Sequence, residues 1–133
     1  MPEGAVVLVD SAPIIYVLEG HRTFAQRFVP LFERQAAGEI YFAVTTIAIA
    51  EILVGPLSNG HEALARRYRA IVESWQVVPL TIDIAESAAS MRARMKLKLA
   101  DAIQVASAVA IQAAALVTHD RDFAAVKGIS ILS

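Results

Sequence analysis

Four acidic residues spread along the chain could together do metal chemistry: Asp10, Glu51, Asp101 and Asp120. Asp10 directly follows the apolar run 5–9, and Asp120 comes shortly after another apolar run. Like charges held close together repel and raise one another's pKa, and a hard divalent cation relieves that repulsion. Carboxylate oxygens with bound water are the ligands that Mg²⁺ and Mn²⁺ accept. The four acids therefore predict a site for Mg²⁺, or Mn²⁺, if the fold brings them together.

Glu51 is the most unusual of these acids, because it is the only charged residue in the stretch 45–54, TTIAIAEILV. Ile47 precedes it by four residues, so Glu51 shares a helix face with an apolar side chain. Burying an ionised carboxylate alone costs too much free energy, so the group must be paired, protonated or bound to a cation. The alternative is that the Glu51 side chain simply reaches water.

The other acids also have structural explanations, which the sequence leaves open. Asp10 could only cap the helix that follows it, and Asp101 would suit the first turn of a helix through the helix dipole. Asp122, two residues beyond Asp120, is the better cap for a short helix over residues 123–126. Whether Asp120 or Asp122 is the fourth acid therefore stays undecided at this point.

Strands that alternate with helices along the chain would position these acids. Apolar runs predict strands over residues 5–9, 40–44, 76–78, 116–118 and 129–132. Apolar residues at helical spacing predict a helix that starts at Pro13 and others over residues 24–37, 47–54, 61–75, 84–95 and 100–115. The alternation predicts an α/β fold, a three-layer α/β/α sandwich around a mostly parallel sheet.

Several residues mark where these helices should begin or break. Pro30 should interrupt or kink the second helix, because proline has no backbone N–H and clashes with the preceding turn. Thr45 or Thr46 can cap the third helix. Asp83, with Glu86 three residues later, resembles a capping box at the start of the fifth helix.

The composition is that of an apolar chain without cysteines. The 133 residues suit a single domain over residues 1–133, and 56% of them are hydrophobic against 19% charged. Part of this apolar surplus should cover an interface, so we expect a homodimer or a bound partner. No stretch is typical of a membrane span or a signal peptide, and the absence of cysteines favours a cytoplasmic location. The net charge of −1 gives no global sign of nucleic-acid binding.

Four ordered motifs make the chain similar to a known family. VLVDSAP, TTIAIAEIL, LADAIQVASA and LVTHDRDF resemble the motifs of PIN-domain nucleases, and above all the VapC-type ribonuclease toxins of toxin–antitoxin pairs. The resemblance covers essentially the whole chain, and the ordered set is more specific than any single motif. It implies a metal-dependent endoribonuclease with a cognate antitoxin. It also assigns the site residues: Asp10, Glu51 and Asp101 as core acids, Asp120 as a fourth and more variable acid, and Ser11 and Thr118 as hydroxyl residues beside them.

RNA would have to approach this acidic site through local basic residues. Lys96 and Lys98 come just before Asp101, so we expect one of them to contact a phosphate. The arginines around Tyr68 (Arg66, Arg67 and Arg69) and those of the next basic run (Arg92 and Arg94) could do the same or could be solvated helix faces. His119 stands where VapC-type toxins often have Asn, and we expect it to be a substrate contact.

Other functions fit the residues less well. A phosphatase of the haloacid-dehalogenase type expects a second Asp two positions after Asp10, where this chain has Ala12. A phospho-acceptor receiver domain needs an acid at the end of a middle strand, where this chain has Thr45 and Thr46. The alternative from another class is a catalytically idle PIN-like module that only binds RNA or protein, and the four retained acids argue against it.

Overall fold

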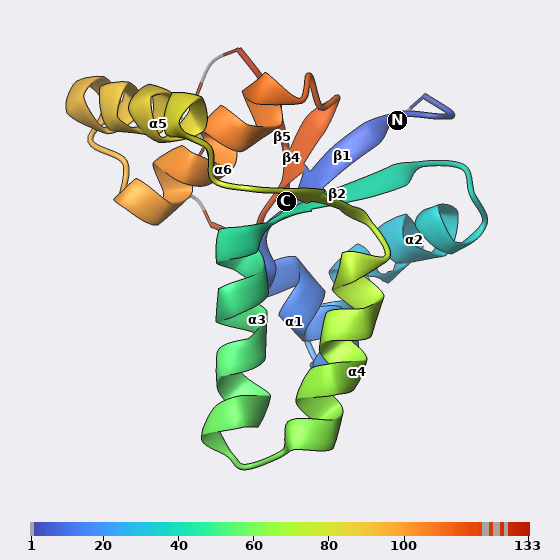
Figure 1. Ribbon diagram of the computed structural model, residues 1–133. Coiled ribbons are helices and arrows are strands. Elements are labelled where there is room, and N and C mark those ends of the chain that lie inside the picture. Colours follow the sequence, from blue (N-terminus) through green and yellow to red (C-terminus); the bar gives the residue numbers. More distant parts are fainter. Residues whose placement is uncertain (1, 121–122, 124–125, 127) are drawn as a thin grey trace.

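Five parallel strands form the centre of the fold (Figure 1). A computed structural model describes residues 2–120, 123, 126 and 128–133. Within them the strands are β1 (Val6–Val9), β2 (Tyr41–Thr45), β3 (Gln76–Val78), β4 (Ala115–Val117) and β5 (Ser130–Leu132). Their order across the sheet is β3-β2-β1-β4-β5, so β1 is the central strand.

The continuous apolar sequence of β1 follows from its position between two layers of helices. Val7 pairs with Phe42 of β2 and with Ala115 of β4, and both faces of the strand are covered. Val7 and Val9 face one hydrophobic cluster while Leu8 faces the other, as the two-residue period of a strand requires. Each of these three side chains is fully buried, which is typical of a parallel sheet.

One helical layer consists of α1 (Ser11–Glu19), α2 (Ala25–Ala36), α3 (Thr46–Ser58) and α4 (Glu62–Glu73). Helices α3 and α4 pack as an antiparallel pair that projects away from the sheet (Figure 1). The core beneath this layer includes Phe28, Ile52 and Val72. The partly buried Trp75 packs against this core through the rings of Phe32 and Phe42.

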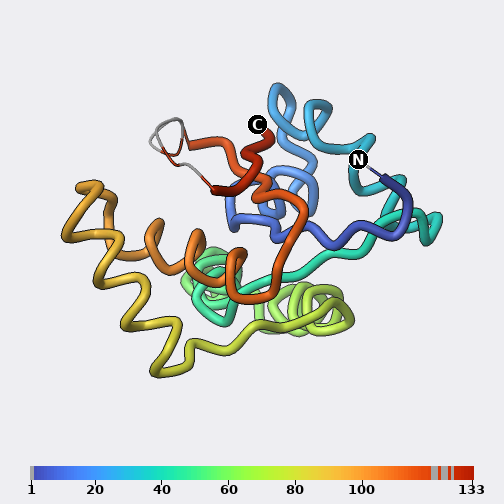
Figure 2. The backbone as a smooth tube through the Cα atoms, turned by 90° about the horizontal axis from the view of Figure 1, so that it is seen from above, coloured from blue at the N-terminus to red at the C-terminus, as the bar shows by residue number. Residues whose placement is uncertain are grey.

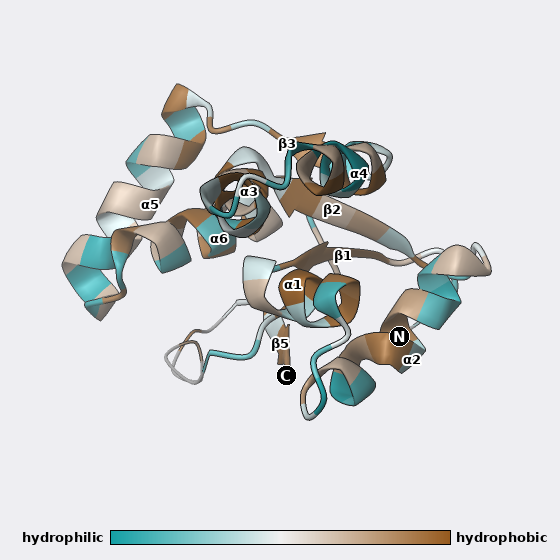
Figure 3. Ribbon diagram, turned by 90° about the horizontal axis from the view of Figure 1, so that it is seen from below, coloured by the Kyte–Doolittle hydropathy of each residue, from teal (hydrophilic) through white to brown (hydrophobic). Residues whose placement is uncertain are grey.

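The second layer consists of α5 (Ile82–Met95) and α6 (Leu99–Ala110), which pack against each other on the opposite face of the sheet (Figure 2). Helix α6 is buried almost throughout, from Ala102 to Ala108. The apolar strands β1 and β2 therefore lie inside the molecule, between helices of mixed polarity (Figure 3). The three-layer α/β/α sandwich is confirmed, and the five strands described are all parallel.

Two predictions about helices are wrong: the interruption at Pro30 and the capping box at Asp83. Helix α2 is not interrupted at Pro30, because Pro30 and Gln26 are both exposed and the Gln26 carbonyl can face water. The capping residue of α5 is Thr81, whose Oγ1 accepts from the N–H of Ile84 at 3.2 Å, and Asp83 lies inside the first turn.

Helix α6 stops at Ala110 and not at residue 115, and β4 begins at Ala115. Gln112 adopts a left-handed backbone with φ of 56°, which turns the chain back toward the sheet. In the part of the chain that the structure describes, no helix is both long and apolar enough to cross a membrane.

Candidate active site

Asp10 and Asp120 lie where the strand order reverses. The chain runs outward from β1 through β2 to β3, and β4 then returns to the other side of β1. Open parallel sheets bind their ligands in the crevice outside the carboxyl ends of such neighbouring strands. Asp10 follows β1 and Thr118 follows β4, and the N–H of Asp10 donates to the carbonyl of Val117 at 2.8 Å.

The Asp10 carboxylate is held in place by three hydrogen bonds. Its Oδ1 accepts from the N–H of Ser11 at 2.9 Å and from Nε2 of Gln104 at 2.8 Å. Its Oδ2 accepts from the hydroxyl of Thr118 at 3.0 Å. Asp10 is thus the N-cap of α1, one of the roles expected for it from the sequence. Its carboxylate is also bound to Gln104 of α6 and to Thr118, which follows β4. A carboxylate has about four lone-pair positions, so one remains for a further ligand.

Gln104 and Thr45 form a buried chain of hydrogen bonds behind Asp10. The Thr45 hydroxyl donates to Oε1 of Gln104 at 2.6 Å and accepts from the N–H of Ala48 at 3.0 Å, so it also caps α3. Both residues are almost fully buried. Neither residue was predicted from the sequence to belong to the site. The available signal was a glutamine in an alanine-rich helix, three residues after Asp101 and therefore on the same helix face.

Glu51 lies in α3 with its side chain exposed, so its carboxylate does reach water. Partial burial raises the pKa of Glu51, and the negative charge of Asp10 raises the pKa further, while a hydrogen bond from the Ser11 hydroxyl opposes both effects. The structure therefore places Glu51 close enough to Asp10 for the two carboxylates to repel each other. Ser11, itself buried, lies between them.

Asp101 and Asp120 lie in the elements next to Asp10. Asp101 is half-buried in the first turn of α6, one turn before Gln104. Asp120 is half-buried, and its N–H donates at 3.0 Å to the same Thr118 hydroxyl that donates to Asp10. Asp122 lies outside the described residues. Among the residues described, no three His, Asp or Glu side chains are arranged so that they could hold a metal ion by themselves.

His119 forms the wall of an open cleft beside Asp120. Its Nδ1 is 3.0 Å from the hydroxyl of Tyr16, and its ring centroid is 4.4 Å from that of Phe24. The cleft has a volume of about 740 Å³, and its lining residues are Ala12, Tyr16, Phe24, Arg27, His119 and Asp120. It thus joins an aromatic surface and one arginine to the acidic site.

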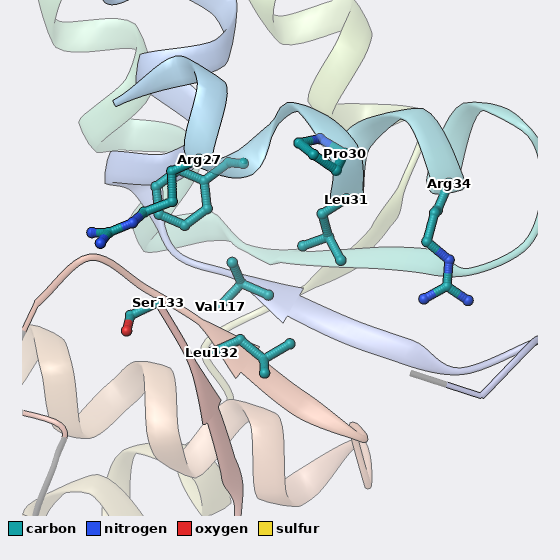
Figure 4. Close-up of a pocket in the computed structure, with 8 residues that line it drawn as sticks. Arg27, Pro30, Leu31, Arg34, Val117, Leu132 and Ser133 are labelled. Carbon is teal, nitrogen blue, oxygen red and sulfur yellow. The ribbon is translucent and has the colours of Figure 1, made fainter. Parts of the chain in front are cut away.

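A smaller apolar pocket of about 250 Å³ lies between α2 and the last two strands (Figure 4). Pro30 and Leu31 face Val117 and Leu132 across it, and the guanidinium groups of Arg27 and Arg34 stand at its opposite ends. Arg34 is paired with Glu39 at 3.1 Å.

The basic residues singled out from the sequence have different surroundings. Lys96 and Lys98 are exposed at the turn between α5 and α6, where Lys96 has a left-handed φ of 56° and Lys98 is the residue before α6. Arg92 stabilises this turn, because its Nη1 donates to the carbonyl of Leu97 at 2.7 Å. Arg66, Arg67 and Arg69 are exposed on α4, and Arg69 is paired with Glu73.

Comparisons with known proteins agree with this geometry. Residues 7–129 match the sequence profile of the PIN domain. The chain belongs to the PIN domain family. No curated protein matched the sequence.

Several solved structures share the PIN fold of this chain. A toxin–antitoxin complex from Klebsiella pneumoniae contains a chain 26% identical, with a TM-score of 0.75 and coverage of 96% of both chains. VapBC-1 of nontypeable Haemophilus influenzae matches at 17% identity and a TM-score of 0.74, over 96% of this chain and 97% of that chain. VapC20 of Mycobacterium tuberculosis, a toxin that cleaves the sarcin–ricin loop, matches at 17% identity and a TM-score of 0.73, over 96% of this chain and 99% of that chain.

Proposed function

We propose that this PIN domain is a divalent-metal-dependent endoribonuclease that hydrolyses RNA phosphodiester bonds, and that it is the toxin of a toxin–antitoxin pair. The observation that carries the proposal is the fixed Asp10 carboxylate at the switch point of the sheet, with Glu51 close enough to be repelled by it. A protein gains no stability from two carboxylates placed to repel each other, whereas a cation-binding site needs them.

The donor set fits a hard cation. Carboxylate and hydroxyl oxygens surround the place where β1 and β4 end, and no sulfur or imidazole ligand is needed. We assign Asp10, Asp101 and Asp120 to Mg²⁺, with Mn²⁺ as the alternative. Part of their coordination would go through water, because the described acids do not converge closely and Mg²⁺ usually keeps several waters. Such a metal, when bound, lowers the pKa of water and offsets negative charge on the phosphate.

Glu51 would orient the attacking water and accept its proton. A raised pKa brings a carboxylate nearer to neutral pH, where a general base works best. Gln104 and Thr118 would keep the Asp10 carboxylate from rotating. Ser11 would hold the Glu51 carboxylate near Asp10 through its hydroxyl. Lys96 or Lys98 would neutralise a phosphate of the incoming RNA.

The partners of the proposed toxin are RNA and an antitoxin. The Klebsiella and Haemophilus structures are toxin–antitoxin assemblies, which supports a cognate antitoxin for this chain as well. We also propose a homodimer, because large apolar side chains such as Val54, Leu57 and Ile82 are exposed in the isolated chain. We propose a cytoplasmic location, which the cysteine-free composition favours.

The decisive experiment is cleavage of a mixed pool of structured RNAs by the purified, antitoxin-free protein with Mg²⁺, Mn²⁺ or EDTA. We expect metal-dependent cleavage that falls by about 100-fold or more in Glu51→Gln, the range expected for loss of an acid–base group. We expect a similar fall in Asp10→Asn, because it removes a proposed metal ligand. Glu86→Gln, an exposed glutamate on α5, is the matched control and should cut like the wild type.

Equal cleavage by the wild type and both variants would mean that a contaminant cuts the RNA and that the site is wrong. Metal binding without cleavage of any RNA in the pool would favour the idle binding module.

A further inference from the structure

The cleft beside Asp120 contains groups that metal chemistry does not use. Its volume of about 740 Å³ lies within the range of roughly 300–1,000 Å³ that holds small ligands. Tyr16 comes from α1, Phe24 and Arg27 come from the start of α2, and His119 follows β4. Three separate parts of the chain therefore converge on one open cavity at the edge of the acidic site.

The aromatic wall of this cleft is held rigidly. The ring of His119 lies 4.4 Å from Phe24 and 5.3 Å from Tyr16, centroid to centroid, and its Nδ1 shares a hydrogen bond with the Tyr16 hydroxyl. His119 remains only half-buried, so part of the ring stays open to the cleft. A fixed and partly open aromatic ring is the kind of surface on which an unpaired nucleobase stacks.

Arg27 brings the positive charge that a nucleotide needs beside a cluster of acids. Its side chain is exposed, lines the cleft, and forms no salt bridge with any described residue. It also lines the neighbouring pockets that contain Asp120 and Val117, so it stands at the border of the acidic site. A guanidinium can bind a phosphate through two parallel hydrogen bonds.

We propose that this cleft is a subsite for one nucleotide of single-stranded RNA, next to the bond that is cut. The base stacks on the His119 ring, with the tilted Phe24 ring beside it, and Arg27 binds a phosphate of the same strand. The proposal rests on the proposed function, because Asp120 belongs to both the cleft and the acidic site. The base chosen by this subsite would contribute to the sequence preference of the enzyme.

The test measures binding and cleavage separately. Binding of a short fluorescein-labelled single-stranded RNA is followed by anisotropy, with EDTA and with Mg²⁺, at several salt concentrations. All proteins in the binding assay carry Glu51→Gln so that the RNA survives. The variants are Arg27→Gln, His119→Ala and His119→Phe, and Arg34→Gln is the control for loss of one positive charge on the same helix.

The two contacts should respond differently to salt. Arg27→Gln should weaken binding about fivefold and make the salt slope shallower by about 0.7, the value for one lost phosphate contact on a single strand. His119→Ala should weaken binding by about tenfold with an unchanged slope, because stacking releases no counterions. His119→Phe should restore binding because it keeps an aromatic ring. Arg34→Gln should bind like its parent.

The outcomes separate the subsite from the nuclease. If Arg27→Gln and His119→Ala bind RNA as tightly as Arg34→Gln, the subsite is wrong even if the wild type cuts RNA. Absence of binding in both EDTA and Mg²⁺ overturns it as well. If the expected binding pattern appears but the wild type cuts no RNA, the cleft binds a nucleotide of single-stranded RNA and the proposed nuclease fails.

Discussion

At the scale of single residues, the main feature is that Asp10 is fixed from three sides while Glu51 is not. Ser11, Gln104 and Thr118 each donate to Asp10, and hydrogen bonds to an ionised group are stronger than those between neutral groups. Glu51 is exposed and feels the charge of Asp10. The pair therefore combines a carboxylate held by three hydrogen bonds with an exposed one that accepts from the Ser11 hydroxyl, which suits the proposed roles of metal ligand and base.

The raised pKa of Glu51 predicts a pH-dependent cost to stability in the metal-free protein. The folded state binds the Glu51 proton more tightly than the unfolded chain does, so ionisation of Glu51 destabilises the fold as pH rises above the ordinary value of 4.5. Glu51→Gln should therefore raise the urea midpoint at neutral pH, and the gain should disappear below that ordinary value. Urea denaturation of the wild type and Glu51→Gln in EDTA, from neutral pH to below the ordinary pKa, measures this difference in midpoint.

The cause of the shift can be tested in the same protein. Asp10→Asn removes the repelling charge and should lower the pKa of Glu51 toward its ordinary value, as followed by NMR of the Glu51 carboxyl carbon. An unchanged Glu51 pKa in this variant would contradict the proximity of the two carboxylates.

Gln104 should matter for both stability and activity. Gln104→Leu keeps the volume but leaves Asp10 and Thr45 without a buried partner, so we expect a loss of about 1–3 kcal/mol in the free energy of unfolding. Gln104→Glu can still accept from Thr45 but no longer donates to Asp10. It should lose cleavage activity more than a variant of an exposed residue, and urea denaturation and RNA cleavage together would show both effects. Wild-type stability in Gln104→Leu would contradict the buried hydrogen-bond chain.

At the scale of elements, the site is assembled from the places where strands turn directly into helices. Only Asp10, the N-cap of α1, separates β1 from α1, and α3 begins immediately after Thr45, the last residue of β2. The caps that satisfy the first free N–H groups of these helices are thus also members of the hydrogen-bonded network. Local helix formation and the placement of the acids depend on the same side chains.

The N-terminus of α5 offers a prediction that separates two capping assignments. Thr81→Ala removes the side chain that accepts from Ile84 and should cost about 1 kcal/mol, the usual value for a lost N-cap. Asp83→Asn only removes a first-turn charge and should cost less, about 0.3–1 kcal/mol. Urea denaturation of the two variants ranks them. A larger loss for Asp83→Asn would restore the capping box expected from the sequence.

At the scale of the whole molecule, the sheet has a protected centre and short edges. β3 and β5, the two edge strands, have three residues each, which limits pairing with other chains. The apolar surplus of the composition lies partly on the helix surface, where Val54 is 59%, Leu57 54% and Ile82 85% exposed. Exposed apolar side chains of this size favour an interface that is covered in the assembled protein.

The proposed homodimer predicts twice the mass of a single chain, with the fold of each chain unchanged. The single chain has a mass of 14.3 kDa, and we expect light scattering to give about twice this value for the antitoxin-free protein. Leu57→Glu should lower the mass toward the monomer if the exposed end of α3 contributes to the interface. Its circular dichroism should stay that of the wild type, because the side chain is not in the core. A monomeric wild type would leave the antitoxin as the partner for this surface.

The sequence by itself determined the layers of the fold and singled out the acids that we propose for the site. Unbroken apolar runs such as 5–9 can be satisfied only between two helical layers, so the parallel sheet follows from local patterns. Helix ends were less certain, because the alanine-rich stretch after Asp101 carries no stop signal, and the sheet rather than local propensity ended α6 at Ala110. Likewise, Thr81 and Asp83 both satisfy the local rule for an N-cap, so the sequence does not choose between them. In the structure Thr81 caps α5.

Only the tertiary structure decided what surrounds those acids. Gln104 is 94 residues from Asp10 and Thr118 is 108 residues away, and no local pattern links residues so far apart. The same holds for His119 and Tyr16, whose hydrogen bond depends on β4 lying beside β1. Side-chain contacts across a sheet are set by strand order and packing, and these are properties of the folded chain rather than of any segment.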